Sequence, residues 1–110
     1  MKNSKFIIGS HLTILDAIDK ISTNSYRTVI VIEKNKVIGV LSEGDILKSI
    51  LKNINLKANV KVAMNKSFKF VKTGQEFKAK EIIKKYLVGI VPVLNKQMEL
   101  KEIIKINQYI

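Results

Sequence analysis

Apolar residues recur in two similar patterns, one in each half of the chain. In each half a short apolar segment is followed by a break that contains a glycine, Gly9 in the first half and Gly74 in the second. Four apolar residues then follow at the i, i+3, i+4, i+7 spacing of a helix with one apolar face. They are Ile14, Ala17, Ile18 and Ile21 in the first half and Ala79, Ile82, Ile83 and Tyr86 in the second. The pattern predicts an internal repeat.

Each predicted helix is followed by two predicted strands. The first strands, RTVIVIE and GIVPVLN, are rich in β-branched residues. Turns are predicted at Asn35-Lys36 and at Asn95-Lys96-Gln97, and the second strands are VIGVL and ELKEIIKI. Because Pro92 has no N–H group, we expect it at the first residue of its strand or on a sheet edge.

The first half continues into another predicted helix, whereas the sequence of the second half ends at Ile110. The apolar residues of this helix are Ile46, Leu47, Ile50, Leu51 and Ile54. Each half is therefore predicted to be a β-α-β-β-α unit, with the last helix of the second unit truncated. We expect an α/β (α+β) fold with a first unit at 1–55, a linker at 56–67 and a second unit at 68–110, together one globular domain of 110 residues.

The composition limits the class of protein. Hydrophobic residues make up 46% of the sequence, but no apolar run approaches the roughly 20 residues that cross a bilayer. The N-terminal residues lack the long apolar region of a secretion signal. No cysteine is present, so neither a disulfide nor a thiolate metal site can form. We expect a soluble cytoplasmic protein with no membrane partner.

The net charge of +11 favours anionic partners, since 20 basic residues face 9 acidic ones. The lysines, however, extend from Lys2 to Lys105, and Arg27 is the single arginine. An ordinary solvated surface has the same spread of lysines along the sequence. With 3 Tyr, 4 Phe and no Trp, there are few side chains on which bases could stack, so we expect no nucleic-acid partner.

The residues Gly39-Val40-Leu41-Ser42-Glu43-Gly44-Asp45-Ile46 join a strand to a helix. Ser42 and Asp45 have the spacing of a capping box, which is the structural interpretation. The alternative is a ligand site. A carboxylate in the first turn can accept hydrogen bonds from two ribose hydroxyls, and the amides of a helix start attract phosphate oxygens. Gly44 lowers helix propensity, which a cap alone does not require, and leaves room for a ligand to approach the backbone.

These residues, with Val91-Pro92-Val93 in the second half, resemble a tandem pair of CBS domains over nearly the whole chain. More narrowly, residues 41–74 resemble the CBS pairs that are fused ahead of sugar-phosphate nucleotidyltransferase domains, in which a Gly-Asp-Ile helix start and a Met-Asn linker recur. The resemblance implies two units packed through their small sheets. It also implies a homodimer through the helices and the regulation of an attached or partner enzyme.

The resemblance further implies an adenine nucleotide, AMP, ADP or ATP, bound mainly by residues of the first unit. The implied binding residues are Ser42, Asp45, Gly44, Arg27, Thr28 and Ile8, with Lys48, Tyr26, Gly89 and Ile90 as secondary ones. The guanidinium of Arg27 suits a phosphate, although it is also compatible with a solvated strand start. In the family, an apolar residue of the first strand and its backbone lie against the adenine, and Ile8 has this position. Ile8 is also compatible with an ordinary core residue.

The second unit departs from the motif. When VIEKNKVIGVLSEGD is laid over VLNKQMELKEIIKIN, Lys101 takes the place of Gly39, Ile104 that of Ser42 and Asn107 that of Asp45. We therefore expect one nucleotide site per chain, with Gly89 and Ile90 only lining a shared cleft.

Nothing in the sequence predicts catalysis, a metal or a required cofactor. His11 has no second ligand at metal spacing and is expected on the surface. There is no nucleophile elbow and no phosphate-binding Gly-Lys loop. The main hypothesis is a regulatory adenine-nucleotide module that is not an enzyme. The alternatives are a ligand-free CBS pair that serves as a dimerisation scaffold, and binding of nucleic acid through the basic surface.

Overall fold

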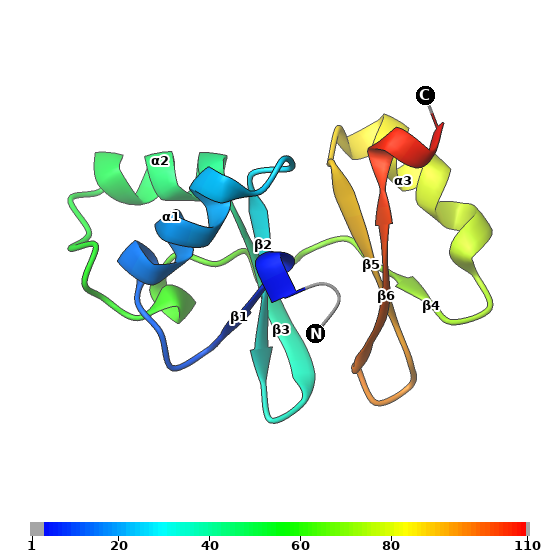
Figure 1. Cartoon of the computed structure of the whole chain (residues 1–110), viewed down its shortest axis with the longest axis horizontal. Coiled ribbons are helices and arrows are strands. Elements are labelled where there is room, and N and C mark those ends of the chain that lie inside the picture. Colours follow the sequence, from blue (N-terminus) through cyan, green and yellow to red (C-terminus); the bar gives the residue numbers. More distant parts are fainter. Residues whose placement is uncertain (1–3, 110) are drawn as a thin grey trace. The chain divides into compact units, whose positions relative to one another are not determined.

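The computed structural model describes residues 4–109, which form three α-helices and two three-stranded sheets (Figure 1). The mixed α+β class predicted from the sequence is confirmed. The chain divides into two compact units. The first contains the chain up to Lys34 and Ile38–Phe68, and the second contains Asn35–Val37 and the chain from Lys69 onwards.

The first unit has the predicted order of elements. They are β1 (Ile7–Gly9), α1 (Ile14–Thr23), β2 (Thr28–Glu33), β3 (Lys36–Ser42) and α2 (Glu43–Leu51). The central strand is β2, which runs parallel to β1 with Val31 opposite Ile8. It connects to β3 through Lys34 and Asn35, both with positive φ as in a type I′ turn. The tight turn therefore begins one residue before the Asn35-Lys36 pair that the sequence suggested.

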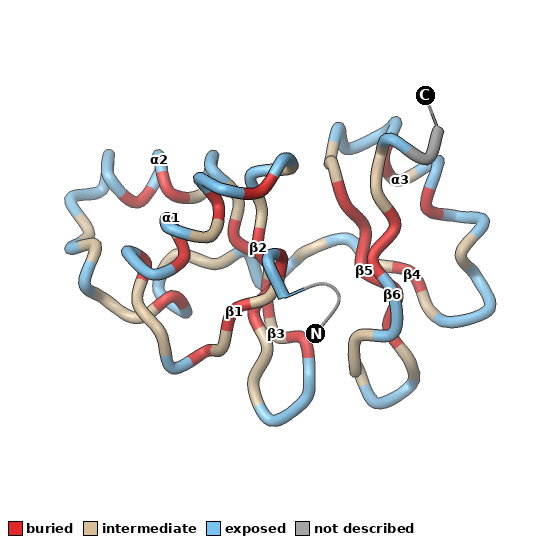
Figure 2. The backbone as a smooth tube through the Cα atoms, viewed as in Figure 1, coloured by how far each residue is buried: buried red, intermediate tan, exposed pale blue. Residues whose placement is uncertain are grey.

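Helices α1 and α2 pack on the same sheet and share one core with it, so the buried residues lie on the strands and on the inner faces of the helices (Figure 2). The segment 56–67 also contributes to this core, because Val60 is fully buried there. Helix α2 buries only Ile46 and Ser49. Three large apolar side chains of α2 are exposed, namely Leu47, Ile50 and Leu51.

The second unit repeats the order with shorter elements. They are β4 (Val71–Lys72), α3 (Ala79–Tyr86), β5 (Ile90–Leu94) and β6 (Leu100–Lys105). Strand β5 lies between β4, to which it is parallel, and β6, to which it is antiparallel. Within the described residues, the segment after β6 forms only a short 3-10 turn at Ile106–Tyr109. The second unit therefore lacks, in this part of the chain, a counterpart of the full helix α2.

Pro92 occupies a position that the sequence did not predict. It is the third residue of β5 and is buried in the middle strand of its sheet, so the expected strand start or edge is wrong. The short strand β4 pairs only with Val93 and Leu94, while Pro92 lies opposite Ile103 of β6. On the side of β4 no strand residue faces Pro92, which lessens the consequence of its missing N–H group.

None of the helices within residues 4–109 has the length and apolar character needed to cross a bilayer.

Two carboxyl groups of the first unit have pKa values below their ordinary ones. The amide and the hydroxyl of Thr13 each donate a hydrogen bond of 2.9 Å to Asp16 and hold its pKa below the ordinary 3.8. The ammonium of Lys61, 2.6 Å away, and the hydroxyl of Ser10, 2.9 Å away, hold the pKa of Glu33 below the ordinary 4.5. Both groups therefore stabilise the fold only while they are ionised.

We expect the free energy of unfolding to fall when the pH drops below about 4.5. The unfolded chain takes up protons at the ordinary pKa values before the folded chain does, so acid shifts the equilibrium toward the unfolded state. Urea unfolding between neutral and acidic pH measures this slope for wild type, Asp16→Asn and Glu33→Gln. Both variants should show a shallower acid slope, whereas Glu102→Gln, an exposed glutamate of β6, should keep the wild-type slope. Equal acid slopes in all four proteins would contradict the conclusion that ionised Asp16 and Glu33 stabilise the fold.

Candidate functional site

The capping box predicted at the start of α2 is present. Ser42 is the N-cap, and its hydroxyl oxygen accepts a hydrogen bond of 3.3 Å from the Asp45 amide. In return, Oδ2 of Asp45 accepts from the amide and the hydroxyl of Ser42, at 2.9 and 3.0 Å. Among residues 4–109 no hydrogen bond reaches the second carboxylate oxygen, Oδ1. One oxygen of Asp45 therefore maintains the cap while the other remains available.

An equivalent capping box starts helix α1, where Thr13 and Asp16 exchange the same hydrogen bonds at 2.9 to 3.1 Å. This second box was not predicted from the sequence. Because the box occurs twice, its geometry alone does not indicate a ligand. The surroundings of each carboxylate therefore determine whether it is a candidate ligand site. Asp16 is exposed, whereas Asp45 is half-buried.

Asp45 lies in the wall of a cavity of about 320 Å³ within the first unit. The cavity lies between α2 and the segment that follows it, and it is lined by Asp45, Lys48, Ser49, Lys52, Ile54, Val62, Ala63, Met64 and Asn65. Within the described chain, no ion pair or hydrogen bond engages the ammonium groups of Lys48 and Lys52. Asp45 thus lines this cavity together with two lysines whose ammonium groups have no partner among the described residues.

The first turn of α2 is accessible next to this cavity. A Cβ atom added to Gly44 would meet only the Ser42 hydroxyl oxygen, at 3.7 Å, so the backbone is open on that side. The Glu43 amide is occupied, because it donates to the Arg27 carbonyl at 3.1 Å. The Gly44 amide has no such partner among residues 4–109 and can donate to an anion.

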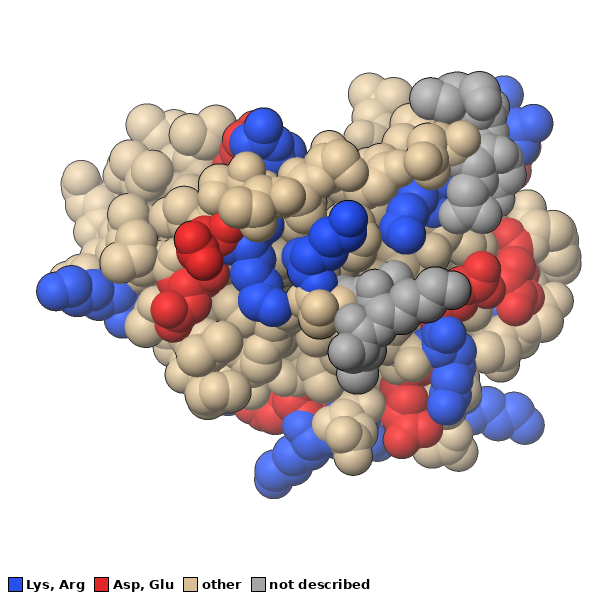
Figure 3. Space-filling view, viewed as in Figure 1, with Lys and Arg blue, Asp and Glu red and all other residues tan. Residues whose placement is uncertain are grey.

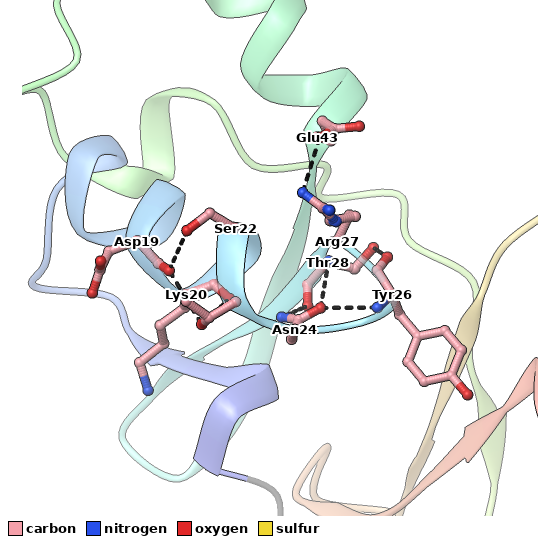
Figure 4. A network of polar contacts seen from close by, with 9 residues as sticks. Asp19, Lys20, Ser22, Asn24, Tyr26, Arg27, Thr28 and Glu43 are labelled. Carbon is pink, nitrogen blue, oxygen red and sulfur yellow. Dashed lines mark hydrogen bonds and ion pairs between the residues drawn. The ribbon is translucent and has the colours of Figure 1, made fainter.

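Arg27 lies against the same helix start (Figure 4). Its backbone is left-handed, with a φ of 52°, and its guanidinium Nη1 is 3.8 Å from a carboxylate oxygen of Glu43. Both side chains are more than half exposed, at 55% and 60%. An ion pair of this length and exposure contributes little, so the guanidinium can turn to a phosphate at small cost.

The loop that carries Arg27 is held by Asn24, a residue that the sequence analysis missed. Asn24 is 2% exposed, and its side-chain amide donates to the carbonyls of Lys5 and Thr28 at 3.1 and 3.0 Å. Its side-chain oxygen accepts from the Tyr26 amide at 3.1 Å. An asparagine directly after the last helical residue is a common helix-ending signal, which could have identified it.

The other predicted residues of the first unit are less available. The Thr28 hydroxyl donates to the Tyr26 carbonyl at 2.9 Å, and the Tyr26 ring points away from Arg27 and contacts Phe6, with ring centroids 5.9 Å apart (Figure 4). Ile8 is 2% exposed and belongs to the core under the helices. The side chain of Ile8 thus belongs to the core, and a ligand at this position would contact the backbone of Ile8.

In the second unit, the Gly89 carbonyl accepts from the Ile106 amide at 2.8 Å, just as the Arg27 carbonyl accepts from Glu43. Ile106 is therefore the counterpart of Glu43, which places Lys105 at the position of Ser42. The correspondence expected from the sequence is wrong by one residue, because β5 and β6 shift register between Val93 and Leu94. Ile90 is 5% exposed and forms part of β5.

Charge does not single out another site. On the face in Figure 3, lysine and arginine side chains are scattered among uncharged and acidic ones. In the part of the chain that the structure describes, no three His, Asp or Glu side chains lie close enough to hold a metal ion. His11 is exposed.

Comparisons with known proteins agree with this fold. The family model described as CBS domain matches residues 1–52. A CBS domain protein of Pyrobaculum aerophilum, solved in complex with AMP, has a TM-score of 0.75 and 20% identity, and the match covers 92% of this chain and 79% of that one. A Methanocaldococcus jannaschii protein, described as an archaeal homologue of γ-AMPK, has a TM-score of 0.77 and 21% identity over 90% of this chain and 42% of that one.

The cytosolic domain of the Mg²⁺ channel MgtE, solved with ATP, has a TM-score of 0.70 and 16% identity over 92% of this chain and 42% of that one. No curated protein matches the sequence. The chain thus has the fold of a CBS-domain pair.

Proposed function

We propose that this chain, which has the fold of a CBS-domain pair, is a regulatory module that binds an adenine nucleotide at the start of α2. The observation that carries the proposal is the carboxylate of Asp45. Its Oδ2 is held by the cap, its Oδ1 accepts no hydrogen bond within residues 4–109, and Asp45 lines a cavity that Lys48 also lines. A ribose hydroxyl can donate to Oδ1 without disturbing the cap.

The neighbouring groups suit the rest of a nucleotide. The Gly44 amide and the positive end of the helix favour a phosphate, and the exposed guanidinium of Arg27 supplies a second, movable donor. Lys48, one turn beyond Asp45, adds a cation to the same cavity. The proteins of like fold that were solved with AMP and with ATP support adenine nucleotides as the ligand class.

In this proposal the module does no catalysis itself and acts on an attached or partner enzyme. Nucleotide binding would shift the equilibrium between two states of that enzyme only if the module binds the nucleotide with different affinity in the two states. The resemblance of residues 41–74 to regulatory pairs of nucleotidyltransferases supports such an enzyme as the partner. The exposed apolar residues Leu47, Ile50 and Leu51 on α2 support a homodimer through the helices.

A dimerisation scaffold that binds no ligand is the second candidate. The capping box at Thr13 and Asp16 favours it, because the same geometry also forms in this chain at an exposed site. The two candidates differ in a single measurable property, the response of the fold to nucleotides.

Thermal unfolding with AMP, ADP, ATP or a short oligonucleotide tests the proposal. A nucleotide at about 100 times its Kd should stabilise the fold by roughly 2.7 kcal/mol. Asp45→Ala should abolish this shift, while Asp16→Ala, which removes the matching cap, should retain it. Each variant should also be less stable than wild type without ligand, because each loses one cap.

A flat response to every nucleotide would favour the scaffold and reject the sensor. A nucleotide shift that survives in Asp45→Ala would place the site elsewhere. A shift with the oligonucleotide that is insensitive to Asp45→Ala and is lost on adding salt would favour nucleic-acid binding.

A further inference from the structure

The cavity that Asp45 lines continues along α2 and has two walls. One wall runs from Asp45 to Lys52, the C-cap of the helix, and the other consists of Ile54 and residues 62–65. All of these residues belong to the first unit. The volume of about 320 Å³ is at the lower end of the range of ligand sites. The first unit therefore builds this cavity from its own residues.

The charged residues of the cavity follow one another along one side of α2. Of the described residues that line it, Asp45 alone is acidic, and Lys48 and Lys52 come three and seven residues later. These spacings keep the three side chains on one side of the helix, with the lysines about 4.5 and 10.5 Å from Asp45 along its axis. The order suits a ligand with hydroxyl groups at one end and several anionic groups in a row.

Asn65, on the opposite wall, adds an amide donor. Its backbone exchanges hydrogen bonds of 2.8 and 3.1 Å with Val40, and its side-chain oxygen accepts from the Ser67 amide at 2.9 Å. Because the oxygen is already used, the side-chain NH2 group is the part left for a ligand. No residue in the described part of the chain accepts a hydrogen bond from it. The cavity thus has donors on both walls.

A nucleoside monophosphate would not use all these donors. In the proposed site the ribose meets Asp45, and the Gly44 amide and the Arg27 guanidinium suit the first phosphate. Lys48 follows Gly44 by one turn of the helix, and Lys52 follows by another turn. Because long side chains on a helix lean toward its N-terminus, the two ammonium groups can continue the row of donors that begins at Gly44.

The two lysines also lack the acidic neighbours that would balance them. Residues four apart share one face of a helix, so Lys48 and Lys52 repel each other. Neither acidic residue of α2 relieves this repulsion, since Glu43 pairs with Arg27 and no ion pair joins Asp45 to a lysine within residues 4–109. Bound phosphate groups would supply the missing negative charge.

We propose, resting on the nucleotide-binding function proposed above, that this site selects ADP and ATP over AMP. The ribose hydroxyls donate to Asp45, and the first phosphate accepts from the start of α2. The phosphates beyond the first lie in the cavity and accept from Lys48, Lys52 and the Asn65 amide. The lysines thereby determine which adenine nucleotide the module senses.

Calorimetric titration of the full chain with AMP, ADP and ATP, at fixed salt and without divalent cations, tests this selectivity. ATP should bind at least about tenfold more tightly than AMP, which corresponds to about threefold for each exposed lysine. Inorganic triphosphate is the probe without a nucleoside. It should bind more weakly than ATP, because it lacks the ribose that meets Asp45.

Lys52→Gln should weaken ATP binding about threefold and leave AMP binding unchanged, because the single phosphate of AMP is held at the other end of α2. Lys48→Gln/Lys52→Gln should remove most of the preference for ATP. The matched control is Lys36→Gln, at the exposed first residue of β3, about 20 Å along the strand from Ser42. It should bind all three nucleotides as wild type does. Asp45→Ala should weaken all three, because they share the ribose.

Equal affinities of wild type for AMP, ADP and ATP would overturn the selectivity and leave the proposed function standing. An unchanged ATP preference in Lys48→Gln/Lys52→Gln would overturn it as well. So would inorganic triphosphate that binds as tightly as ATP, since the cavity would then be a polyphosphate site independent of the nucleoside. Absence of binding by all three nucleotides would reject the proposed function and the selectivity together.

Discussion

Replacing Asn24 with alanine should lower the free energy of unfolding by about 3 kcal/mol, more than a typical point substitution. The side chain is 2% exposed and joins four backbone groups, the carbonyls of Lys5 and Thr28 and the amides of Tyr26 and Thr28. Alanine leaves these groups without a partner in a place with little access to water, and an unsatisfied buried group costs about 1–3 kcal/mol.

Urea unfolding of the full chain measures this loss, with Asn55→Ala as the matched control. Asn55 is exposed, and within residues 4–109 its side chain accepts a single local hydrogen bond, from the Lys57 amide at 2.9 Å. The control should lose less than about 1 kcal/mol, as surface substitutions usually do. If Asn24→Ala were no less stable than Asn55→Ala, the role of Asn24 in holding the Arg27 loop would have to be abandoned.

The second large effect is expected at Gly39, in the middle of β3. A Cβ atom added at Gly39 would lie 2.5 Å from Sδ and 2.8 Å from Cγ of Met64, far inside van der Waals contact. Gly39→Val should therefore destabilise the fold by about 3 kcal/mol, although valine favours strands, because overpacking outweighs propensity. Met64 also lines the Asp45 cavity, so a displaced Met64 side chain should weaken nucleotide binding as well.

A double-mutant cycle with Met64→Ala tests this explanation by urea unfolding. Shortening Met64 removes the atoms that the new side chain meets, so Gly39→Val should be much less destabilising in the Met64→Ala background. A coupling of about 1 kcal/mol or more is expected, within the range found for residues in contact. Additive effects of the two substitutions would mean that the cost at Gly39 has another origin.

The nucleotide proposal and the capping box are compatible because they use different atoms of Asp45. A cap alone needs one oxygen, and Asp16 shows that this chain also builds such a cap at an exposed position. The difference between the two aspartates lies in what surrounds them. This makes Asp16→Ala a close control for Asp45→Ala.

The sequence predicted features whose causes are local. The spacing of Ile14, Ala17 and Ile21 produced a helix because neighbouring turns place such residues on one face. The Ser42–Asp45 box formed because its partners are three residues apart. These interactions are made within one turn of chain, so the order of residues determines them.

Only the tertiary structure decided features that join distant segments. The burial of Asn24 depends on Lys5, 19 residues away, and the Asp45 cavity depends on the return of Met64 and Asn65 toward α2. Pro92 is tolerated in a central strand because β4 begins only opposite Val93, and a register shift between β5 and β6 displaced the end of β6 by one residue from the alignment of the repeats. Helical periodicity and caps are set by neighbours in the chain. Cavities, register and buried polar contacts arise instead from the packing of distant segments, and the number of residues between two segments does not tell how close they lie in space.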